Sequence, residues 1–154
     1  MRRAALALAL ALAASGAAAC PQGAQERAAF REAFAAELDA WRAERGLAAL
    51  RPDPGAQTAA QQWAERLAAE GRLTHRGPDG AGVGARLSAA GVSWRTAAEN
   101  LAAGDIAGPA ALLRLWEESP DHRANLASPE VSRAGLGLAC GADGLVAALA
   151  LAGP

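Results

Sequence analysis

The sequence predicts an α+β fold, with about four helices packed on a small, mainly antiparallel sheet. Three observations support this prediction. Four segments with helical spacing come first, two short apolar segments come last, and a glycine-containing turn separates those two. Helices followed by pairing strands are typical of α+β domains, in which helices cover one part of an antiparallel sheet.

The first expected helix spans residues 25–45. Phe30, Phe34, Leu38 and Trp41 recur at the spacing of one buried helix face. Gly46 follows, and a glycine just after the last turn is a common helix end. A connector containing two prolines, residues 47–54, then leads to the next helix.

Three shorter helices are expected at residues 55–70, 83–90 and 109–118. Trp63 belongs to the apolar face of the second, which Gly71 ends. Trp116 belongs to the apolar face of the fourth, and Pro109 suits its first turn because the missing N–H has no helical partner there. The dipeptide Ser119-Pro120 ends the fourth helix.

The two expected strands are residues 135–140 and 145–151. Residues 141–144, Gly-Ala-Asp-Gly, have the composition of a hairpin turn between them. Residues 92–96 are expected to be extended. Nothing in the sequence indicates a repeat or a second module, so we expect one domain over residues 20–154.

The N-terminus predicts export. A basic start is followed by an uninterrupted Ala and Leu run over residues 4–14 and then by small residues. This pattern is typical of a secretory signal peptide, which we assign to residues 1–19. The run is shorter than the roughly 20 residues that a spanning helix needs. We therefore expect a periplasmic or extracellular protein without a transmembrane span.

The two cysteines, Cys20 and Cys140, allow two interpretations. An even cysteine count in an exported protein favours a disulfide between them. Alternatively, Cys20 would be the lipidated first residue of a bacterial lipoprotein, although Ala17 stands where a lipobox usually has Leu.

The charge balance argues against nucleic-acid binding. Without Arg2 and Arg3, the 15 basic residues become 13, against 16 acidic residues. A nucleic-acid-binding domain usually has a basic patch or stripe instead. We expect a monomer whose partner is a small molecule or a lipid.

The candidate site consists of His75, Glu99 and His122. The chain has no other histidine. Two imidazoles and a carboxylate can hold a divalent metal, with Zn²⁺ the ion best matched to that set through His75 and His122. The same three side chains can instead perform acid–base catalysis, with the carboxylate orienting an imidazole.

Each of these residues also has a structural interpretation. His75 would suit the end of the second helical segment, where its charged form interacts favourably with the helix dipole. Asn125 is expected to hydrogen-bond a loop backbone, and Ser119 to cap a turn. The four tryptophans are expected to anchor the core; they are Trp41, Trp63, Trp94 and Trp116.

Several motifs together resemble the CAP superfamily, also called SCP-like extracellular proteins, and in particular its short bacterial branch. The resemblance covers residues 30–151. Its main pieces are the Trp41–Leu50 segment, the tetrad Ala98-Glu99-Asn100-Leu101, the run Trp116-Glu-Glu-Ser-Pro-Asp-His-Arg-Ala-Asn-Leu126 and the strand motif Gly135-Leu-Gly137.

The resemblance implies an α-β-α sandwich with a central cleft. In the family that cleft is lined by two histidines and, in animal members, two glutamates. His75, Glu99 and His122 would occupy three of these positions, with Asn100 and Asn125 in structural roles. The fourth position falls on Ser119, and Glu117 and Glu118 are one or two residues away.

Three functions remain open at the level of the sequence. The first is an exported binding protein whose His/Glu cleft holds a small apolar ligand or a divalent metal. The second is a metal-dependent or acid–base hydrolase acting on peptide or cell-wall material. The third is an envelope interaction or structural protein. No nucleophile elbow surrounds Ser119, which favours binding over catalysis.

Overall fold

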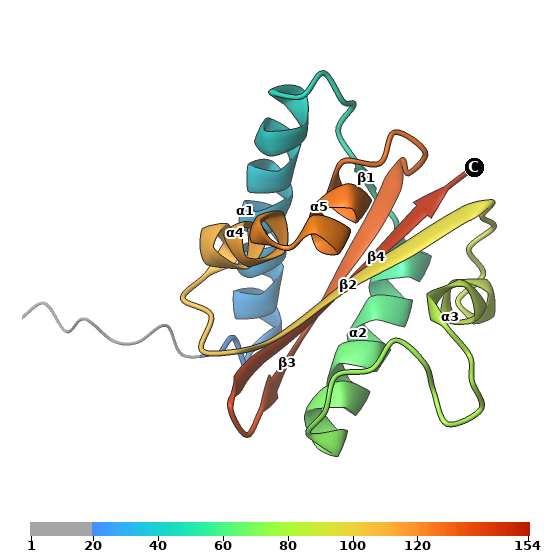
Figure 1. Ribbon diagram of the computed structural model, residues 1–154. Helices are drawn as coiled ribbons and strands as arrows, with labels where there is room; N and C mark the ends of the chain where they lie inside the picture. Colours follow the sequence, from blue (N-terminus) through green and yellow to red (C-terminus); the bar gives the residue numbers. More distant parts are fainter. Residues whose placement is uncertain (1–19) are drawn as a thin grey trace, which may run out of the picture.

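The computed structural model describes residues 20–154 (Figure 1). The predicted signal peptide, residues 1–19, lies outside the described residues. The described chain contains five helices and four strands: α1 Ala24–Ala43, β1 Arg51–Pro52, α2 Pro54–Glu70, α3 Val83–Ala89, β2 Thr96–Gly104, α4 Pro109–Glu118, α5 Pro120–Leu126, β3 Arg133–Gly141 and β4 Gly144–Gly153.

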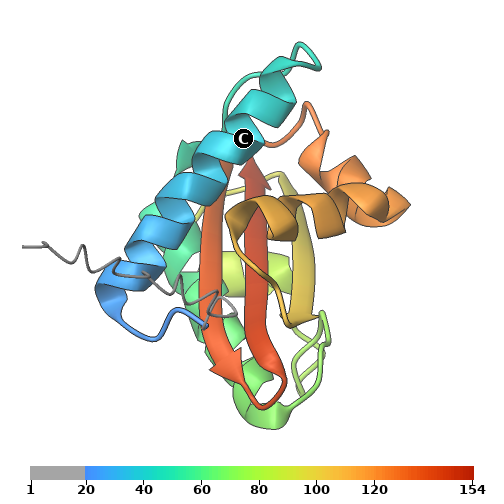
Figure 2. The same ribbon diagram turned by 90° about the vertical axis from the view of Figure 1, so that its left-hand side faces the viewer.

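The sheet lies between two helical layers. Its strand order is β1-β3-β4-β2, so β1 and β2 form opposite edges. Only β1 and β3 run parallel; the other two pairs are antiparallel. Helices α1, α4 and α5 cover one face, and α2 and α3 cover the other (Figures 1 and 2). The predicted α-β-α sandwich with a mainly antiparallel sheet is confirmed.

Strand β4 runs through the middle of the sheet and is buried on both faces. Its alternate residues point to opposite layers. Leu149 and Leu151 pack with Phe34 and Trp116 in the larger core cluster, on the side of α1 and α4. Val146 packs on the other side against α2 and β2. The central position explains why residues 145–151 contain no polar side chain.

Helix α2 packs directly on the backbone of β3. A Cβ atom on Gly135 would lie 2.3 Å from the carbonyl carbon of Ala56, and one on Gly137 would lie 2.0 Å from the carbonyl oxygen of Ala60. Only glycine fits at both positions. The Gly-Leu-Gly motif therefore allows α2 to pack directly against the backbone of β3.

Side-chain amides of α2 complete the edge of β3. Strand β1 pairs with β3 only at Arg133 and Ala134. Beyond that point, Gln57 accepts from the Leu136 N–H at 3.1 Å and donates to the Leu136 carbonyl at 2.8 Å. Gln61 makes the same two bonds to Leu138, at 3.0 and 2.9 Å. These amides replace a neighbouring strand, which satisfies and protects the edge.

The structure corrects the expected elements in three places. A fifth helix, α5, follows Ser119, and Pro120 occupies its first turn instead of simply ending α4. The nine-residue strand β2 was not expected, because Ala, Glu and Asn have low strand propensity. It forms because it pairs with β4 over its whole length. The two-residue strand β1 was also missed.

Two expectations about single residues are wrong. Helix α2 ends at Glu70 with Gly71 in the left-handed conformation at φ 66°, so His75 lies in the following loop and not at a helix end. Trp94 is 38% exposed and does not anchor the core. Trp41, Trp63 and Trp116 are buried as expected.

Cys20 and Cys140 form a disulfide, which confirms the predicted pair. Their sulfur atoms lie 2.07 Å apart across a separation of 120 residues. The bridge joins the segment before α1 to the end of β3. Within residues 20–154, every helix is too short or too polar to span a bilayer.

Candidate functional site

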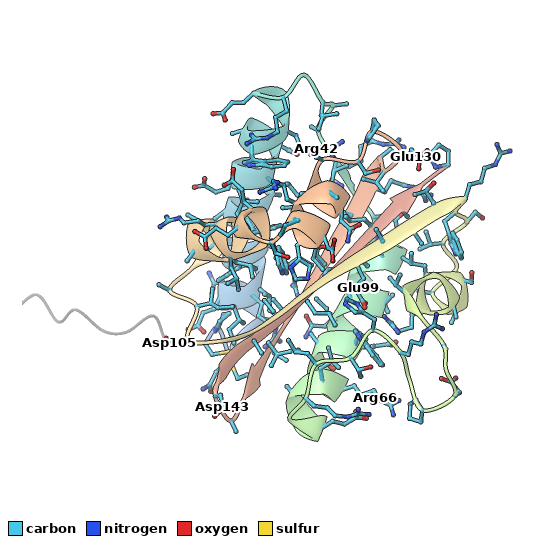
Figure 3. All side chains as sticks on the ribbon, viewed as in Figure 1. Arg42, Arg66, Glu99, Asp105, Glu130 and Asp143 are labelled. Carbon is cyan, nitrogen blue, oxygen red and sulfur yellow. A yellow bond between two sulfur atoms is a disulfide. The ribbon has the colours of Figure 1, made fainter. Side chains whose placement is uncertain are left out.

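Glu99 lies at the middle of the edge strand β2 and is labelled in Figure 3. Its side chain is 3% exposed. It shares a face of the strand with Ala97 and Leu101, which pack towards α3 and α2. A buried carboxylate needs compensating partners, and Glu99 has two.

The first partner is His75, in the loop after α2. Its Nδ1 atom lies 2.9 Å from Oε1 of Glu99. The imidazole itself is 59% exposed. With the proton on Nδ1, the neutral ring donates a hydrogen bond to Glu99, and its Nε2 carries a lone pair that can accept a hydrogen bond or bind a cation. A carboxylate behind an imidazole sets both the tautomer and the ring orientation.

The second partner is Arg86 of α3, a residue that the sequence did not single out. Its Nη2 atom lies 2.5 Å from Oε2 of Glu99. Its guanidinium stacks on the ring of Trp63, 3.8 Å from the centroid. It also donates to the backbone oxygen of His75 at 3.3 Å and of Ala81 at 3.2 Å. No pattern distinguishes Arg86 from the other helical arginines, so only the fold identifies it.

Two asparagines attach α5 to the outer edge of β2. Asn125 donates to the Glu99 carbonyl at 3.3 Å and to Oδ1 of Asn100 at 2.9 Å. Asn100 is fully buried and donates to the carbonyl oxygen of His122 at 3.0 Å. This network holds the backbone of His122 beside the strand that carries Glu99.

His122 is half-buried on α5. Burial lowers the pKa of its imidazole, and the charge of His75 lowers that pKa further, while Asp121 acts in the opposite direction. His75 therefore acts electrostatically on His122, although 47 positions separate them in the chain. We call His75, Glu99 and His122 the polar cluster.

Trp116 also belongs to this edge of the sheet. Its indole N–H donates to the Leu101 carbonyl at 3.0 Å, two residues beyond the carbonyl that Asn125 caps. The Trp116–Leu126 motif thus covers the outer edge of β2 at two points, and this anchors both α4 and α5.

The candidates for a fourth position lie around the junction of α4 and α5. Glu117 pairs with Arg45 of the segment after α1, at 3.1 Å. Glu118 is exposed, and Ser119 joins the two helices without a side-chain capping bond. Within residues 20–154, the partners of the Glu99 carboxylate are His75 and Arg86 and include none of these three.

The donor set does not fit a three-ligand zinc site. Both carboxylate oxygens of Glu99 are engaged, one of them by a cationic guanidinium that would repel a metal ion. Among residues 20–154, no group of three or more His, Cys, Asp or Glu side chains is placed to hold a metal. Catalytic zinc usually has three protein ligands, and only the two imidazoles remain.

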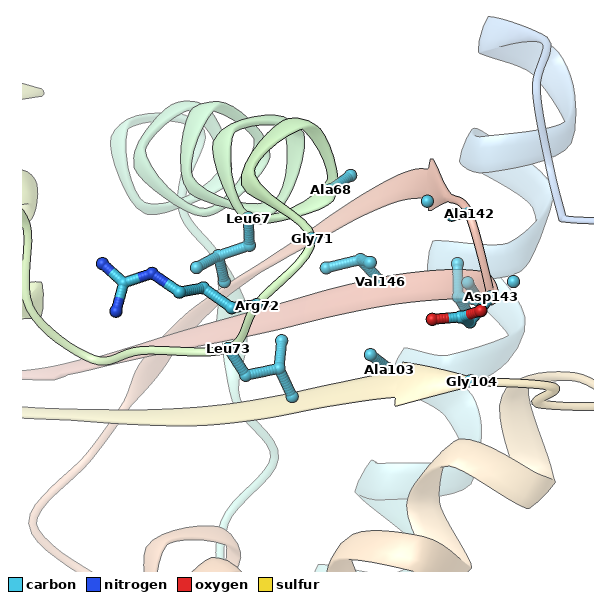
Figure 4. A pocket seen from close by; sticks show the side chains of 13 residues that line it. Leu67, Ala68, Gly71, Arg72, Leu73, Ala103, Gly104, Ala142, Asp143 and Val146 are labelled. Atoms are coloured by element: carbon cyan, nitrogen blue, oxygen red, sulfur yellow. The ribbon is translucent and has the colours of Figure 1, made fainter.

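One cavity of residues 20–154, of about 360 Å³, lies next to the polar cluster and is lined by Trp63 and Arg86, whereas two others lie away from it. A hollow of about 170 Å³ lies between α2, the segment that carries Leu73 and the β3–β4 hairpin (Figure 4). A groove of about 370 Å³ lies between α1 and β3, at the opposite edge of the sheet from Glu99. The polar cluster itself reaches the surface through His75, whose side chain is 59% exposed.

The chain belongs to the CAP family, described as the cysteine-rich secretory protein family, whose sequence model matches residues 35–150. The resemblance found in the motifs is thereby confirmed. No curated protein sequence matches the chain.

Solved structures confirm the fold. An extracellular protein of Bacillus anthracis containing an SCP domain is 20% identical with a TM-score of 0.73; the match covers 87% of this chain and 45% of that protein. An outer surface protein of Borrelia burgdorferi is 21% identical with a TM-score of 0.72. The match covers 81% of this chain and 92% of that protein. A cysteine-rich secretory protein of Staphylococcus aureus is 17% identical with a TM-score of 0.64. The match covers 80% of this chain and 38% of that protein.

Proposed function

We propose that this chain is an exported binding protein of the CAP family, and that its polar cluster holds a small polar ligand or a divalent cation through the two imidazoles. The observation that supports this most is the exposed imidazole of His75, fixed from behind by Glu99 at 2.9 Å. A ring held in one tautomer presents a defined nitrogen to a ligand without losing further rotational freedom.

The surroundings of the polar cluster favour a polar ligand over an apolar one. The charged groups of Glu99 and Arg86 lie directly behind His75. An apolar molecule placed there would desolvate these charges without compensating them. The small apolar ligand that the sequence left open is therefore better matched to another part of the molecule.

Binding is favoured over nucleophilic catalysis for a geometric reason. An activated nucleophile normally lies within hydrogen-bonding reach of its base. Among residues 20–154, the imidazoles of His75 and His122 make no hydrogen bond to a hydroxyl or thiol group; the side-chain partner of His75 is Glu99. The nearby hydroxyl of Thr74 instead bonds the backbone of Arg76.

Calorimetric titration of the mature protein with Zn²⁺ tests the cation part of this proposal. We expect weak one-to-one binding that is lost in the double variant His75→Ala/His122→Ala. The control Asp121→Asn leaves both imidazoles in place and should retain binding. If the wild type takes up no Zn²⁺, or the double variant binds equally well, the polar cluster is not a cation site.

A hydrolase that uses water directly is the second candidate. The pair of His75 and Glu99 supports it, because a carboxylate-oriented imidazole can act as a general base towards water. Incubation with purified peptidoglycan and with a casein substrate tests this candidate. Product release that disappears in His75→Ala and Glu99→Gln would favour it, whereas equal background in all proteins would exclude it for these substrates.

Export and the state of Cys20 belong to the same proposal. We propose that the chain leaves the cytoplasm with residues 1–19 removed and with the bridge to Cys140 formed. Mass spectrometry of the exported protein should then show the mass of residues 20–154 less two hydrogens. A diacylglyceryl adduct on Cys20 would indicate a lipoprotein instead, and free thiols would contradict both forms.

A further inference from the structure

A polar cavity of about 350 Å³ lies between α1 and α2, outside the edge of β3 that β1 leaves free. Apart from Ala24, the residues that line it carry polar side chains and come from both helices; they are Arg27, Arg31, Gln57, Thr58, Gln61 and Gln62. Within residues 20–154, no carboxylate belongs to this lining. The cavity is therefore cationic and rich in hydrogen-bonding groups.

The positive charge of the cavity comes from Arg27 and Arg31, which lie on adjacent turns of α1. Residues four apart share a helix face, and like charges placed there repel each other. Burial lowers the pKa of Arg31, and the charge of Arg27 lowers it further. None of the ion pairs formed within residues 20–154 includes either arginine. Two neighbouring positive charges thus share one cavity without a negative partner from the described chain.

The carboxylates around this cavity have other partners or face elsewhere. Glu26 accepts hydrogen bonds from the backbone N–H groups of the two residues before α1, at 3.0 and 3.3 Å. Glu65 lines the neighbouring cavity, which Arg27 also borders, and accepts from Nε2 of Gln61 at 2.8 Å. Glu32 lines the groove between α1 and β3. The charge of the two arginines is therefore open to a ligand.

Both guanidinium groups keep donors for such a ligand. Arg31 donates from Nε to the Leu136 carbonyl at 2.8 Å and from Nη2 to Oε1 of Gln61 at 2.5 Å. Arg27 donates from Nη1 to the carbonyl of Gln22. These bonds do not use Nη1 of Arg31 or Nε and Nη2 of Arg27. Since the bonds to Leu136 and Gln61 already order the Arg31 side chain, an anion would bind it with little further loss of side-chain freedom.

The opposite wall of the cavity comes from α2 and offers neutral polar groups. Gln57 is fixed by its two bonds to the backbone of Leu136. The hydroxyl of Thr58 donates to the Pro54 carbonyl at 2.9 Å, so its oxygen can still accept. Gln62 is exposed on the same wall. A side-chain amide supplies both donors and an acceptor, which suits the hydroxyl groups of a sugar.

We propose that this cavity binds a sugar phosphate, whose phosphate group pairs with Arg27 and Arg31 while its hydroxyl groups contact the amide of Gln62. Arginine–phosphate pairs are among the stronger polar contacts in proteins, and two arginines match the nearly double charge of a phosphate monoester. Ligand sites usually have volumes of about 300–1,000 Å³, so this cavity suits one small sugar. It adjoins β3, whereas the polar cluster lies on the opposite edge strand β2. Either site can therefore fail without the other.

Calorimetry of the full mature chain with three probes tests this proposal. The probes are glucose 6-phosphate, inorganic phosphate and glucose, so that the charge and the sugar are also measured separately. We expect glucose 6-phosphate to bind with one-to-one stoichiometry and about tenfold more tightly than inorganic phosphate, a difference of about 1.4 kcal/mol. We expect no measurable binding of glucose, because it lacks the charge that the arginines recognise.

Three variants locate the site. Arg27→Gln and Arg31→Gln should each weaken binding of glucose 6-phosphate about tenfold, because each removes one charge-assisted contact with the phosphate. Gln62→Ala should weaken binding of glucose 6-phosphate and leave binding of inorganic phosphate unchanged, which separates the contact with the sugar from the contact with the charge. The matched control is Arg114→Gln, which removes the same charge from an exposed position on α4 and should bind glucose 6-phosphate like the wild type.

Several results would overturn the proposal. These are the absence of glucose 6-phosphate binding to the wild type, equally tight binding of either other probe, or equal loss of affinity in Arg27→Gln and Arg114→Gln. Should Arg31→Gln fail to fold, as judged by circular dichroism, Arg27→Gln still decides the question, because Arg27 makes no bond to the sheet.

The His75→Ala/His122→Ala variant separates this proposal from the one for the polar cluster. Loss of Zn²⁺ binding in that variant, with glucose 6-phosphate binding intact, would show that the two sites are separate. Loss of glucose 6-phosphate binding in the same variant would place the phosphate at the polar cluster and overturn the assignment to Arg27 and Arg31.

Discussion

The imidazole of His75 and the carboxylate of Glu99 lie 2.9 Å apart, although 24 residues separate them in the chain. The loop after α2 brings the first to the edge strand that carries the second. Arg86 holds the other carboxylate oxygen, so that Glu99 is shared between an exposed imidazole and a stacked guanidinium. This one buried carboxylate therefore holds both His75 and Arg86.

Replacing that carboxylate should destabilise the protein. In Glu99→Gln, the buried charge that compensates Arg86 is lost while the side chain keeps its size. Breaking one partner of a buried ion pair costs about 3–5 kcal/mol in general, and we expect about 3 kcal/mol here. Urea unfolding measures the change in the free energy of unfolding.

Glu70→Gln is the matched control for this experiment. Glu70 also pairs with two arginines, Arg66 and Arg72, but at the surface. Exposed ion pairs contribute about 0–1 kcal/mol. Equal effects of Glu99→Gln and Glu70→Gln would contradict the compensating role assigned to Glu99.

The lowered pKa of His122 predicts a dependence of stability on pH. Its ordinary value is 6.5, and burial and then His75 lower it in the folded state. The unfolded chain therefore takes up a proton at a pH where the folded chain does not. Stability should fall as the pH decreases through 6.5 and should level off below the folded pKa.

Two variants check this assignment by urea unfolding at pH 7.5, 6.0 and 5.0. His122→Asn cannot titrate, so it should lose less stability between pH 7.5 and 5.0 than the wild type. Asp121→Asn removes the group that raises the pKa of His122, so it should lose more. An unchanged pH dependence in both variants would show that His122 is not responsible.

The asparagine network predicts a specific role for Asn125. Asn125→Ala leaves the Glu99 carbonyl and the buried Oδ1 of Asn100 without this donor. An unsatisfied buried polar group costs about 1–3 kcal/mol, and we expect about 2 kcal/mol of lost stability. The ring signals of His122 in NMR spectra should also shift, because Asn100 holds its backbone.

Ser119→Ala provides the comparison for Asn125→Ala. The Ser119 side chain makes no capping hydrogen bond at the start of α5. A substitution without lost contacts usually changes stability by less than about 0.5 kcal/mol. A large effect at Ser119, or none at Asn125, would mean that α5 is held in place by other contacts.

The contact of α2 with β3 predicts that Gly137→Ala is strongly destabilising. The added Cβ would lie 2.0 Å from the Ala60 carbonyl oxygen, which is backbone and cannot rotate away. Overpacking costs about 1–3 kcal/mol and occasionally more, and we expect about 3 kcal/mol. Thermal unfolding measures it.

Gly82→Ala is the control, because a Cβ there meets nothing within 4 Å. Gly82 is the N-cap residue of α3 and makes no side-chain capping bond. Gly82→Ala should therefore change stability by less than about 1 kcal/mol. A Gly137→Ala protein as stable as Gly82→Ala would show that α2 can move away from the sheet at little cost.

Sequence alone predicted much of the fold correctly. The apolar face of α1 and the Gly-rich turn between β3 and β4 are local patterns, which nearby residues determine through helix spacing and turn chemistry. The pair Cys20 and Cys140 was also accessible, because the chain has no other cysteine. His75, Glu99 and His122 were identified as candidates from residue type and motif order.

Other features required the tertiary structure. Strand β2 is built from residues with weak strand preference and forms because β4 supplies its hydrogen-bonding partners. Helix α5 is held by Asn125, which donates hydrogen bonds to Glu99 and Asn100 of strand β2. Neither kind of information is present in a local window of sequence.

The contrast is sharpest at Glu99. Its residue type and motif marked it as a candidate, and this much the sequence determined. That its carboxylate is buried, that Arg86 stacks on Trp63 to compensate it, and that His75 reaches it from a loop were decided by packing between α2, α3 and β2. A buried charge is stable only where distant parts of the chain supply its partners, and those partners meet only in the folded protein.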